Sequence, residues 1–285
     1  MQAAVSLRLF QAIPVTMLGE AEGVPVLMYH HLAPEGTYDG TENEDNAAII
    51  SVEQFAIQME YLSVEGYQTI FASELISLLQ RQEPLPEKTV VITFDDAYES
   101  VYVYAYPILK QYGFKADVSI IGATINNPAQ ANYQPEHLST MSYEQIGILQ
   151  QSGLFQFHSH TYNLHRIVPL SSKGGVGYAA TSRVWLTEQA RRENAEEKTE
   201  RLRIDFSRQD ELLSSVDINS VILFYPYGET NRDLISIAKE AGMQAAFTVK
   251  TGLVTADCDI FRLPRITISQ RDDISSFIRK LQKGK

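Results

Sequence analysis

The segment Thr89-Val-Val-Ile-Thr-Phe-Asp-Asp96 decides how the rest of the chain is arranged. Its continuous run of strand-forming residues is typical of a strand buried on both faces, as in parallel sheets. Successive side chains of a strand point to opposite faces, so Asp95 and Asp96 cannot both continue the strand and serve one site. We expect a turn to bring both carboxylates to the carboxyl end of the strand, where α/β proteins bind ligands. The spacing alone leaves a second interpretation open, in which the two residues cap a helix over Tyr98–Tyr112.

The composition is that of a globular chain. Of 285 residues, 44% are hydrophobic and 21% are charged, which is enough for a full core, and a single α/β barrel routinely has this length. The formal net charge of -11, without a basic stripe, argues against a nucleic-acid partner. The single cysteine, Cys258, excludes an intrachain disulfide, which suits a cytosolic protein and equally an exported bacterial one. No stretch is apolar for long enough to predict a transmembrane helix.

The chain divides into a short N-terminal segment and one domain. Residues 1–23 contain one arginine and a short apolar patch interrupted by Gln11 and Pro14. They make a poor signal peptide and are expected to be a leader or a disordered segment. Over residues 24–285, strand-like and helix-like stretches alternate without a fixed-period repeat. This alternation predicts a single domain with a mostly parallel sheet, either open or closed into a barrel.

Three stretches in the second half of the chain lead to further expectations. Residues 166–185 contain Gly and Ser and are expected to form an irregular excursion. The stretch Thr187–Leu213 predicts a long helix, whose Glu and Arg runs are most simply a solvated face. The last strand is predicted over Phe261–Ile268.

A histidine pair follows a second predicted strand, in His160-Thr-Tyr-Asn-Leu-His165. A spacing of five does not place two imidazoles on one helix face, so a loop must bring them together. Two histidines and a strand-end carboxylate form a set that suits Zn²⁺ or another divalent first-row metal. Taken singly, His30, His31 and His158 are more simply interpreted as satisfied core or surface residues.

A third cluster, Phe224-Tyr-Pro-Tyr-Gly228, follows another predicted strand. By itself it is most simply a strand and turn ended by proline. The three clusters together resemble the motifs of the polysaccharide deacetylases of carbohydrate esterase family 4. The resemblance runs from about Val24 to the last helix and includes the ending Leu263-Pro-Arg-Ile-Thr-Ile268.

The resemblance implies a distorted (β/α) barrel with seven strands and a metal-dependent active site. Asp95 would be the catalytic base, and Asp96, His160 and His165 would hold a divalent metal, which is expected to be Zn²⁺, with Co²⁺ or Ni²⁺ as alternatives. The turn containing Tyr225, Pro226 and Tyr227 would form a wall of the substrate groove, and a backbone N–H near Tyr227 would hold the oxyanion. His30, at the end of the opening strand, is a further candidate for substrate binding.

The sequence departs from the family pattern at three positions. Ala97 stands where Gly usually follows the Asp pair, and Phe224 replaces the Arg that orients the catalytic Asp in many members. The late His that acts as general acid is absent, because no histidine follows His165. The Leu-Met-Tyr-His opening and the His-x4-His spacing are more similar to the branch that acts on poly-N-acetylglucosamine exopolysaccharides.

One arginine is a candidate to replace the missing motif Arg. In the predicted last strand, Ile266 and Ile268 share the face of Arg262, which suits packing against outer helices, whereas Arg265 lies on the opposite face. We therefore expect Arg265 to point into the barrel and to keep Asp95 ionised. The alternative is a structural ion pair at the other end of the barrel.

The resemblance thus implies a hydrolase that removes N-acetyl groups from a polysaccharide containing N-acetylglucosamine and releases acetate. We expect a monomer that acts outside the cytoplasm on an exopolysaccharide, on peptidoglycan or on a chitin-like glycan. Two alternatives remain at this point: a barrel that binds glycan without catalysis, and a metal-dependent amidase or esterase acting on a small molecule.

Overall fold

The strand predicted over Thr89–Phe94 is β5, and all six of its residues are buried. The computed structural model describes residues 21–37, 48–125, 133–134, 136 and 138–283. Within it, β5 lies between two parallel neighbours, β1 (Val26–Tyr29) and β6 (Ala116–Ile120). A strand paired on both edges and covered on both faces has no side that needs polar residues, which explains its continuous apolar run.

The main sheet is parallel and curls into a barrel. Its other strands are β4 (Gln68–Thr69), β7 (Phe155–Ser159), β12 (Ile222–Phe224), β13 (Ala245–Phe247) and β14 (Ile266–Thr267). Among the described residues the order is β13-β12-β7-β6-β5-β1-β14, and β4 also pairs with β5. The two ends of this order meet, because Leu263, just before β14, forms a parallel bridge to Phe247 of β13. The predicted distorted (β/α) barrel is therefore confirmed.

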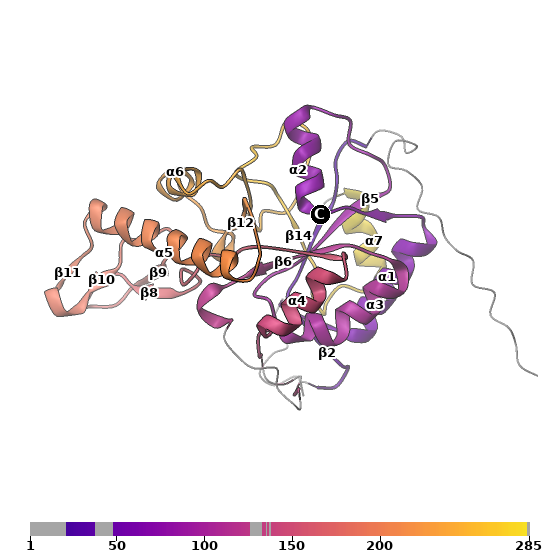
Figure 1. Ribbon diagram of the computed structural model, residues 1–285, viewed down its shortest axis with the longest axis horizontal. Coiled ribbons are helices and arrows are strands. Elements are labelled where there is room, and N and C mark those ends of the chain that lie inside the picture. Colours follow the sequence, from indigo (N-terminus) through magenta and orange to yellow (C-terminus); the bar gives the residue numbers. More distant parts are fainter. Residues whose placement is uncertain (1–20, 38–47, 126–132, 135, 137, 284–285) are drawn as a thin grey trace, which may run out of the picture.

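Helices cover the outside of the barrel (Figure 1). They are α1 (Val52–Val64), α2 (Ala72–Arg81), α3 (Tyr106–Tyr112), α4 (Tyr143–Gln151), α5 (Ala195–Ser215), α6 (Arg232–Glu240) and α7 (Ile274–Lys283), and a π-helical stretch over Val101–Ala105 leads into α3. Figure 1 shows α1, α3 and α7 grouped on one side of the sheet, whereas α5 and α6 lie towards the other. The carboxyl ends of the strands are left to the loops, which form the site described below.

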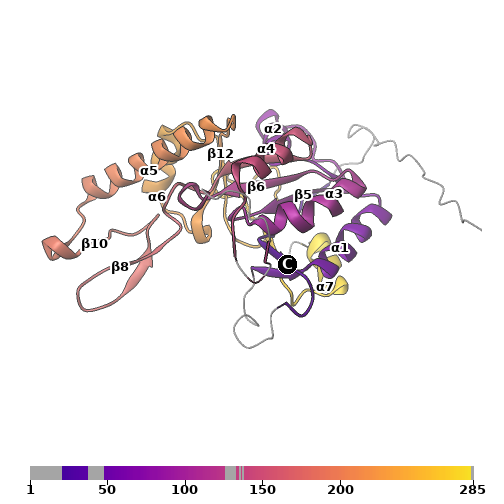
Figure 2. The same ribbon diagram turned by 60° about the horizontal axis from the view of Figure 1, so that its bottom comes forward.

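Two small hairpins occupy the excursion after β7. The strand β8 (Ile167–Pro169) pairs antiparallel with β9 (Val176–Tyr178), and β10 (Trp185–Leu186) pairs antiparallel with β11 (Arg191–Arg192). Figures 1 and 2 both show these strands beside the N-terminal half of α5, on one side of the molecule. The stretch predicted to be irregular over residues 166–185 therefore contains regular pairs.

The predicted start of the long helix is wrong. The helix begins at Ala195 and not at Thr187, because Asn194 and Glu197 form a capping box. The Asn194 side chain accepts a hydrogen bond from Glu197 N (2.9 Å), and the Glu197 carboxylate accepts one from Asn194 N (2.7 Å). The charged composition is similar on both sides of this cap, so composition did not reveal the boundary.

The last strand is shorter than predicted, since β14 has only two residues within Phe261–Ile268. Pro264 has no N–H and cannot donate to a strand ladder, which shortens the regular pairing. Elsewhere, β2 (His31–Ala33) and β3 (Ile49–Ser51) form a separate parallel pair.

The N-terminal expectation stays a prediction, because residues 1–20 of the segment 1–23 lie outside the described residues. Among the helices that the structure describes, none is both long enough and apolar enough to span a bilayer.

Candidate metal centre and active site

The two carboxylates sit in a sharp turn at the end of β5. Asp96 and Ala97 both adopt left-handed backbone conformations, with φ of 68° and 53°. Non-glycine residues rarely adopt this region, so the conformation has a cost that the surrounding contacts must offset. Ala97 is fully buried and its carbonyl accepts a hydrogen bond from Met141 N (2.9 Å). The helix-cap interpretation is wrong, because the Asp95 and Asp96 oxygens face side chains across the barrel mouth.

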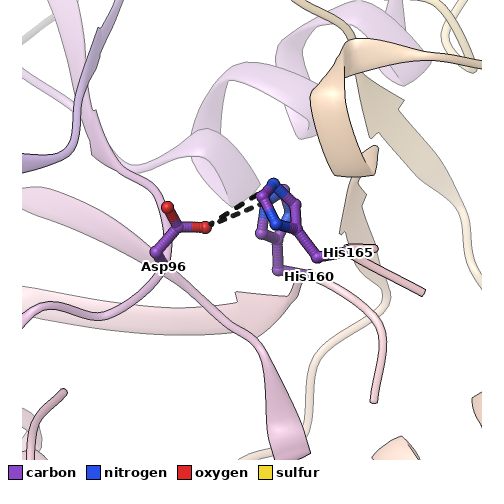
Figure 3. A group of neighbouring side chains, drawn as sticks. All are labelled: Asp96, His160 and His165. Carbon is purple, nitrogen blue, oxygen red and sulfur yellow. Dashed lines mark ion pairs between the residues drawn. The ribbon is translucent and has the colours of Figure 1, made fainter. Parts of the chain in front are cut away.

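Three side chains converge on one point (Figure 3). The Asp96 Oδ1 atom lies 3.4 Å from His160 Nε2 and 3.9 Å from His165 Nε2. All three ligand atoms lie within 4.8 Å of one another, with Asp96 and His160 buried and His165 half-buried. The loop after β7 wraps back to bring the two imidazoles together, with Thr161 in the left-handed region at φ 67°. The geometry brings together all three predicted metal ligands.

The donor set fits a divalent cation. The His160 Nδ1 atom lies 2.8 Å from the Phe224 carbonyl oxygen, which only accepts, so Nδ1 holds the proton. In a neutral imidazole Nε2 then presents a lone pair towards Asp96. The Asp96 Oδ1 atom is buried and has no hydrogen-bond partner among the described residues. A lone pair facing a buried, unpartnered carboxylate oxygen is stabilised by a cation between them, and a set of two His and one Asp suits Zn²⁺.

His165 is held differently. Its ring stacks on Tyr227, with centroids 4.1 Å apart and planes inclined by 19°. Tyr227 is also in ring contact with Tyr178 of β9, at 4.6 Å. Burial and the nearby His160 lower the pKa of His165, which favours the neutral ligand form. An aromatic series therefore runs from the metal centre to the first hairpin.

Asp95 is bonded to Arg265. The two guanidinium nitrogens lie 2.8 Å from Asp95 Oδ1 and 2.7 Å from Oδ2, a bidentate pair. Arg265 is 0% exposed and its guanidinium lies 4.9 Å from the ring centroid of Phe224. Burial raises the pKa of the Asp95 carboxyl, but the Arg265 charge and hydrogen bonds outweigh it and hold that pKa well below its usual range. Asp95 is thus an ionised carboxylate at neutral pH.

Three polar residues that support this pair were not singled out from the sequence. The Ser119 hydroxyl donates to Asp95 Oδ1 (2.8 Å), and Arg265 donates to Thr93 Oγ1 (3.2 Å) and to the Thr248 carbonyl (3.0 Å). Ser119 and Thr93 are polar residues within buried strands. Their alternation with apolar neighbours was the available indication that they face the barrel interior.

His30 reaches the same mouth from the end of β1. Its Nε2 lies 4.0 Å from Asp95 Oδ2, and its side chain is 18% exposed. His30 Nδ1 is buried and has no hydrogen-bond partner among the described residues. The adjacent His31 is buried and packs edge-on against Tyr98. Of the two consecutive histidines, only His30 faces the carboxylates.

The prediction that Tyr225 binds substrate is wrong. Tyr225 is 0% exposed, its hydroxyl donates to the Phe261 carbonyl (3.1 Å), and burial raises its pKa to about 12. Pro226 is buried as well, at the start of a 3₁₀ turn over Pro226–Gly228. Only Tyr227, half-buried and left-handed at φ 58°, remains beside the metal centre. A β-strand presents alternate residues to opposite sides, which sends Tyr225 into the core.

His158 is a satisfied core residue, as the simpler interpretation held. Its Nε2 lies 2.7 Å from Asp117 Oδ1 and its Nδ1 lies 2.9 Å from Ser220 Oγ. The second Asp117 oxygen accepts from Ala72 N (2.9 Å), which ties α2 to the barrel interior. His158 takes no part in the metal centre.

The fold and the site together define a parallel (β/α) barrel with two histidines and one aspartate arranged for a metal, beside a buried Asp–Arg pair. The family model for polysaccharide deacetylase matches residues 82–246, which is more than half of the chain. The chain belongs to the polysaccharide deacetylase family.

Individual relatives support this assignment. The chain is 30% identical over 249 residues to the poly-beta-1,6-N-acetyl-D-glucosamine N-deacetylase of Escherichia coli (strain K12), covering 84% of this chain and 37% of that protein. The chain thus spans little more than a third of that relative. A de-N-acetylase from Aggregatibacter actinomycetemcomitans superposes with a TM-score of 0.76 at 26% identity, covering 90% of this chain and 98% of that one. The BpsB deacetylase domain from Bordetella bronchiseptica gives 0.71 at 26% identity, over 87% and 96%.

Proposed function

We propose that this protein is a metal-dependent hydrolase that removes N-acetyl groups from a polysaccharide containing N-acetylglucosamine and releases acetate. The observation that supports this most directly is the ionised, buried Asp95 beside the Asp96–His160–His165 set. The names of the relatives support a β-1,6-linked poly-N-acetylglucosamine as the substrate. Since such a polymer lies outside the cell, we also propose an extracytoplasmic place of action.

The metal would be held by Asp96, His160 and His165. A divalent cation there supplies Lewis-acid activation of the attacking water and of the acetyl carbonyl. Zn²⁺ is the proposed ion, since its usual ligands are His nitrogens and carboxylate oxygens, and Co²⁺ or Ni²⁺ are alternatives. Ser159, the last residue of β7, and the Phe224 carbonyl fix where His160 points.

Asp95 is the proposed general base. Its two oxygens are held by Arg265 and Ser119, so that the carboxylate keeps one orientation. It takes a proton from the water as the water attacks the acetyl carbon. Arg265 contributes by keeping Asp95 ionised, and its two hydrogen bonds orient the carboxylate in place of the Arg that Phe224 replaces.

His30 is the proposed source of the proton for the leaving amine. It is a titratable side chain at the barrel mouth that is not one of the proposed metal ligands. It follows β1, which pairs with one edge of β5, whereas β6 pairs with the other edge. An amine leaves only when protonated, so the reaction needs a donor there. The Tyr227 N–H is the proposed oxyanion donor. The next two N–H groups in the turn are already used, because Gly228 N donates to Tyr225 O and Glu229 N donates to Pro226 O.

The Asp95–Arg265 pair also weighs against a barrel that only binds glycan. The missing late His and the missing motif Arg both favour that alternative, but the guanidinium of Arg265, just before β14, is bonded to Asp95. A binding surface does not require a buried carboxylate held ionised beside a metal set.

Acetate release tests the proposal. The purified protein, stripped of metal and reloaded with Zn²⁺, is incubated with oligomers of β-1,6-linked N-acetylglucosamine, with chitin oligomers, with peptidoglycan and with 4-nitrophenyl acetate. We expect acetate from the β-1,6-linked oligomers, its loss with a chelator and its recovery with Zn²⁺. Hydrolysis of the small ester alone would favour the small-molecule esterase, and no acetate from any glycan with the reloaded protein would contradict the proposal.

A further inference from the structure

The long helix α5 presents an inward row of polar side chains. Arg201, Asp205 and Gln209 follow one another at a spacing of four, which places them on one helix face. Asp205 is 7% exposed and Gln209 is 1% exposed. The interpretation of all the charged runs in this helix as a solvated face is therefore wrong for this row. A buried carboxylate needs partners that stabilise its charge.

The partners of Asp205 lie in the loop between the two metal-ligand histidines. Asp205 Oδ1 accepts a hydrogen bond from Tyr162 N (2.9 Å), and Oδ2 accepts one from Asn163 N (2.8 Å). Each carboxylate oxygen thus takes one backbone donor from the short stretch that joins His160 to His165. Hydrogen bonds from N–H groups to an ionised carboxylate are stronger than those to a neutral acceptor.

The same loop is also held by the residues that follow β6. Gly122 N donates to the Thr161 carbonyl (3.1 Å), and Ala123 N donates to the Tyr162 carbonyl (2.7 Å). Gln209, one helical turn beyond Asp205, donates from Nε2 to the Ile120 carbonyl (2.9 Å). The space is filled: a Cβ added to Gly122 would lie 2.3 Å from Gln209 Oε1. The ligand loop is therefore fixed between α5 and the carboxyl end of β6.

The two histidines depend on this loop to different degrees. His160 directly follows β7, and its own Nδ1 is bonded to the Phe224 carbonyl. His165 stacks on Tyr227, and its backbone position follows from the conformation of the loop, in which Thr161 is left-handed. Non-glycine residues in that conformation cost free energy, so the loop needs contacts that hold it.

We propose that Asp205 is a positioning residue that sets the metal affinity of the site by fixing the loop on which His165 stands. The inference rests on the metal centre of the proposed function, and it adds Asp205 as a residue that supports that centre. An Asn at this position has one carbonyl oxygen and can accept from only one of the two amides, while its NH₂ group faces the other donor. The loop would then lose one of its two fixed points, and His165 would move relative to Asp96.

Metal binding to the apoprotein tests the inference without any substrate. Wild type, Asp205→Asn and Asp210→Asn are stripped of metal and titrated with Zn²⁺ against a chromophoric chelator. Asp210 is the matched control, because it is an exposed carboxylate on the same helix that undergoes the same chemical change. We expect Asp205→Asn to bind Zn²⁺ about 10–100-fold more weakly, as for other residues that orient metal ligands, and Asp210→Asn to bind like the wild type.

Two further measurements separate positioning from general destabilisation. The visible absorption of bound Co²⁺ should change in Asp205→Asn and not in Asp210→Asn, because the arrangement of ligands around the ion changes. An unchanged Zn²⁺ affinity and Co²⁺ spectrum in a folded Asp205→Asn would overturn the inference. If that variant does not fold, amide hydrogen exchange of the wild-type apoprotein decides. Slow exchange at the Tyr162 and Asn163 amides supports the inference that Asp205 fixes the loop, and exchange as fast as in an exposed loop overturns it. None of these outcomes depends on acetate release, so failure of the deacetylase assay is distinguishable from failure of this inference.

Discussion

Arg265 and Asp95 are 170 positions apart in the sequence, yet both guanidinium nitrogens of Arg265 contact the Asp95 carboxylate, at 2.8 and 2.7 Å. The Arg265 side chain is fully buried, and the Asp95 side chain is 4% exposed. The consequence of this pairing is that the pKa of Asp95, the proposed base, is lowered chiefly by a residue from a distant part of the sequence.

Replacing Arg265 with Met should lower turnover about tenfold or more, with the metal retained. Arg265 lowers the pKa of Asp95, so its removal raises that pKa, and Asp95 becomes ionised only at higher pH. The acidic limb of the pH–rate profile should therefore move upward. Arg262→Met is the control, since Arg262 pairs with Asp259 at the surface. An unchanged acidic limb in folded, metal-loaded Arg265→Met would rule out this role.

The same pair predicts a stability pattern. Arg265→Met leaves a buried, uncompensated carboxylate and should cost about 3–5 kcal/mol, and the double variant Arg265→Met/Asp95→Asn should recover part of that loss. Because the pKa of Asp95 is lower in the folded chain, its contribution to stability is present above about pH 3.8 and is lost as the pH falls below that value. Urea unfolding of the four proteins measures this cycle. A double variant whose loss of stability equals the sum of the two single losses would show that the two residues are not coupled.

Removing a metal ligand should remove the metal. Asp96→Ala and His165→Ala each leave two of three ligand side chains, so both should purify with little metal and no activity. Metal content by atomic emission and Zn²⁺ titration measure this. Stoichiometric metal in both purified variants would show that the ion, if bound, is held elsewhere.

Asp95→Asn separates binding from catalysis. Asp95 is bonded to Arg265 and Ser119 and is not one of the three proposed ligands, so the variant should keep its metal and lose about 10²–10⁴-fold in turnover. Turnover near that of the wild type would end the assignment of Asp95 as the base. Loss of the metal together with activity would instead assign Asp95 to the metal site.

His30→Ala tests the proton donor through the leaving group. An amine must be protonated to leave, whereas 4-nitrophenolate leaves without a proton. The variant should therefore lose hydrolysis of N-acetyl groups and keep most of its hydrolysis of an activated acetyl ester. The imidazole that is removed lies 4.0 Å from Asp95 Oδ2, and His31, which packs against Tyr98, is left in place. A parallel loss on both substrates would mean that His30 serves binding or structure.

Local pattern predicted much of the site. The apolar run before Asp95 and Asp96 indicated a buried parallel strand, and a turn at its carboxyl end follows from two consecutive carboxylates. The same alternation in the last strand placed Arg265 on the inner face, although the regular strand is shorter than predicted. The alternation of side chains also indicated that Tyr225 points into the core. We instead followed the resemblance to the family and expected Tyr225 to bind substrate, which is wrong.

The sequence by itself determined the periodic features: which residues end strands, which face of a strand they take, and which residue types can hold a metal. These follow from backbone geometry over a few residues, which the order of residues specifies directly. Only the tertiary structure decided which long-range partners meet. The contact of Asp205 with the Tyr162 and Asn163 amides joins segments more than 40 positions apart, at distances of 2.9 and 2.8 Å. Backbone donors carry no residue identity, so no pattern of side chains indicates that a helix carboxylate will bind them. The burial of Asp205 depends on the packing of α5 against the end of β6, which is a property of the assembled barrel.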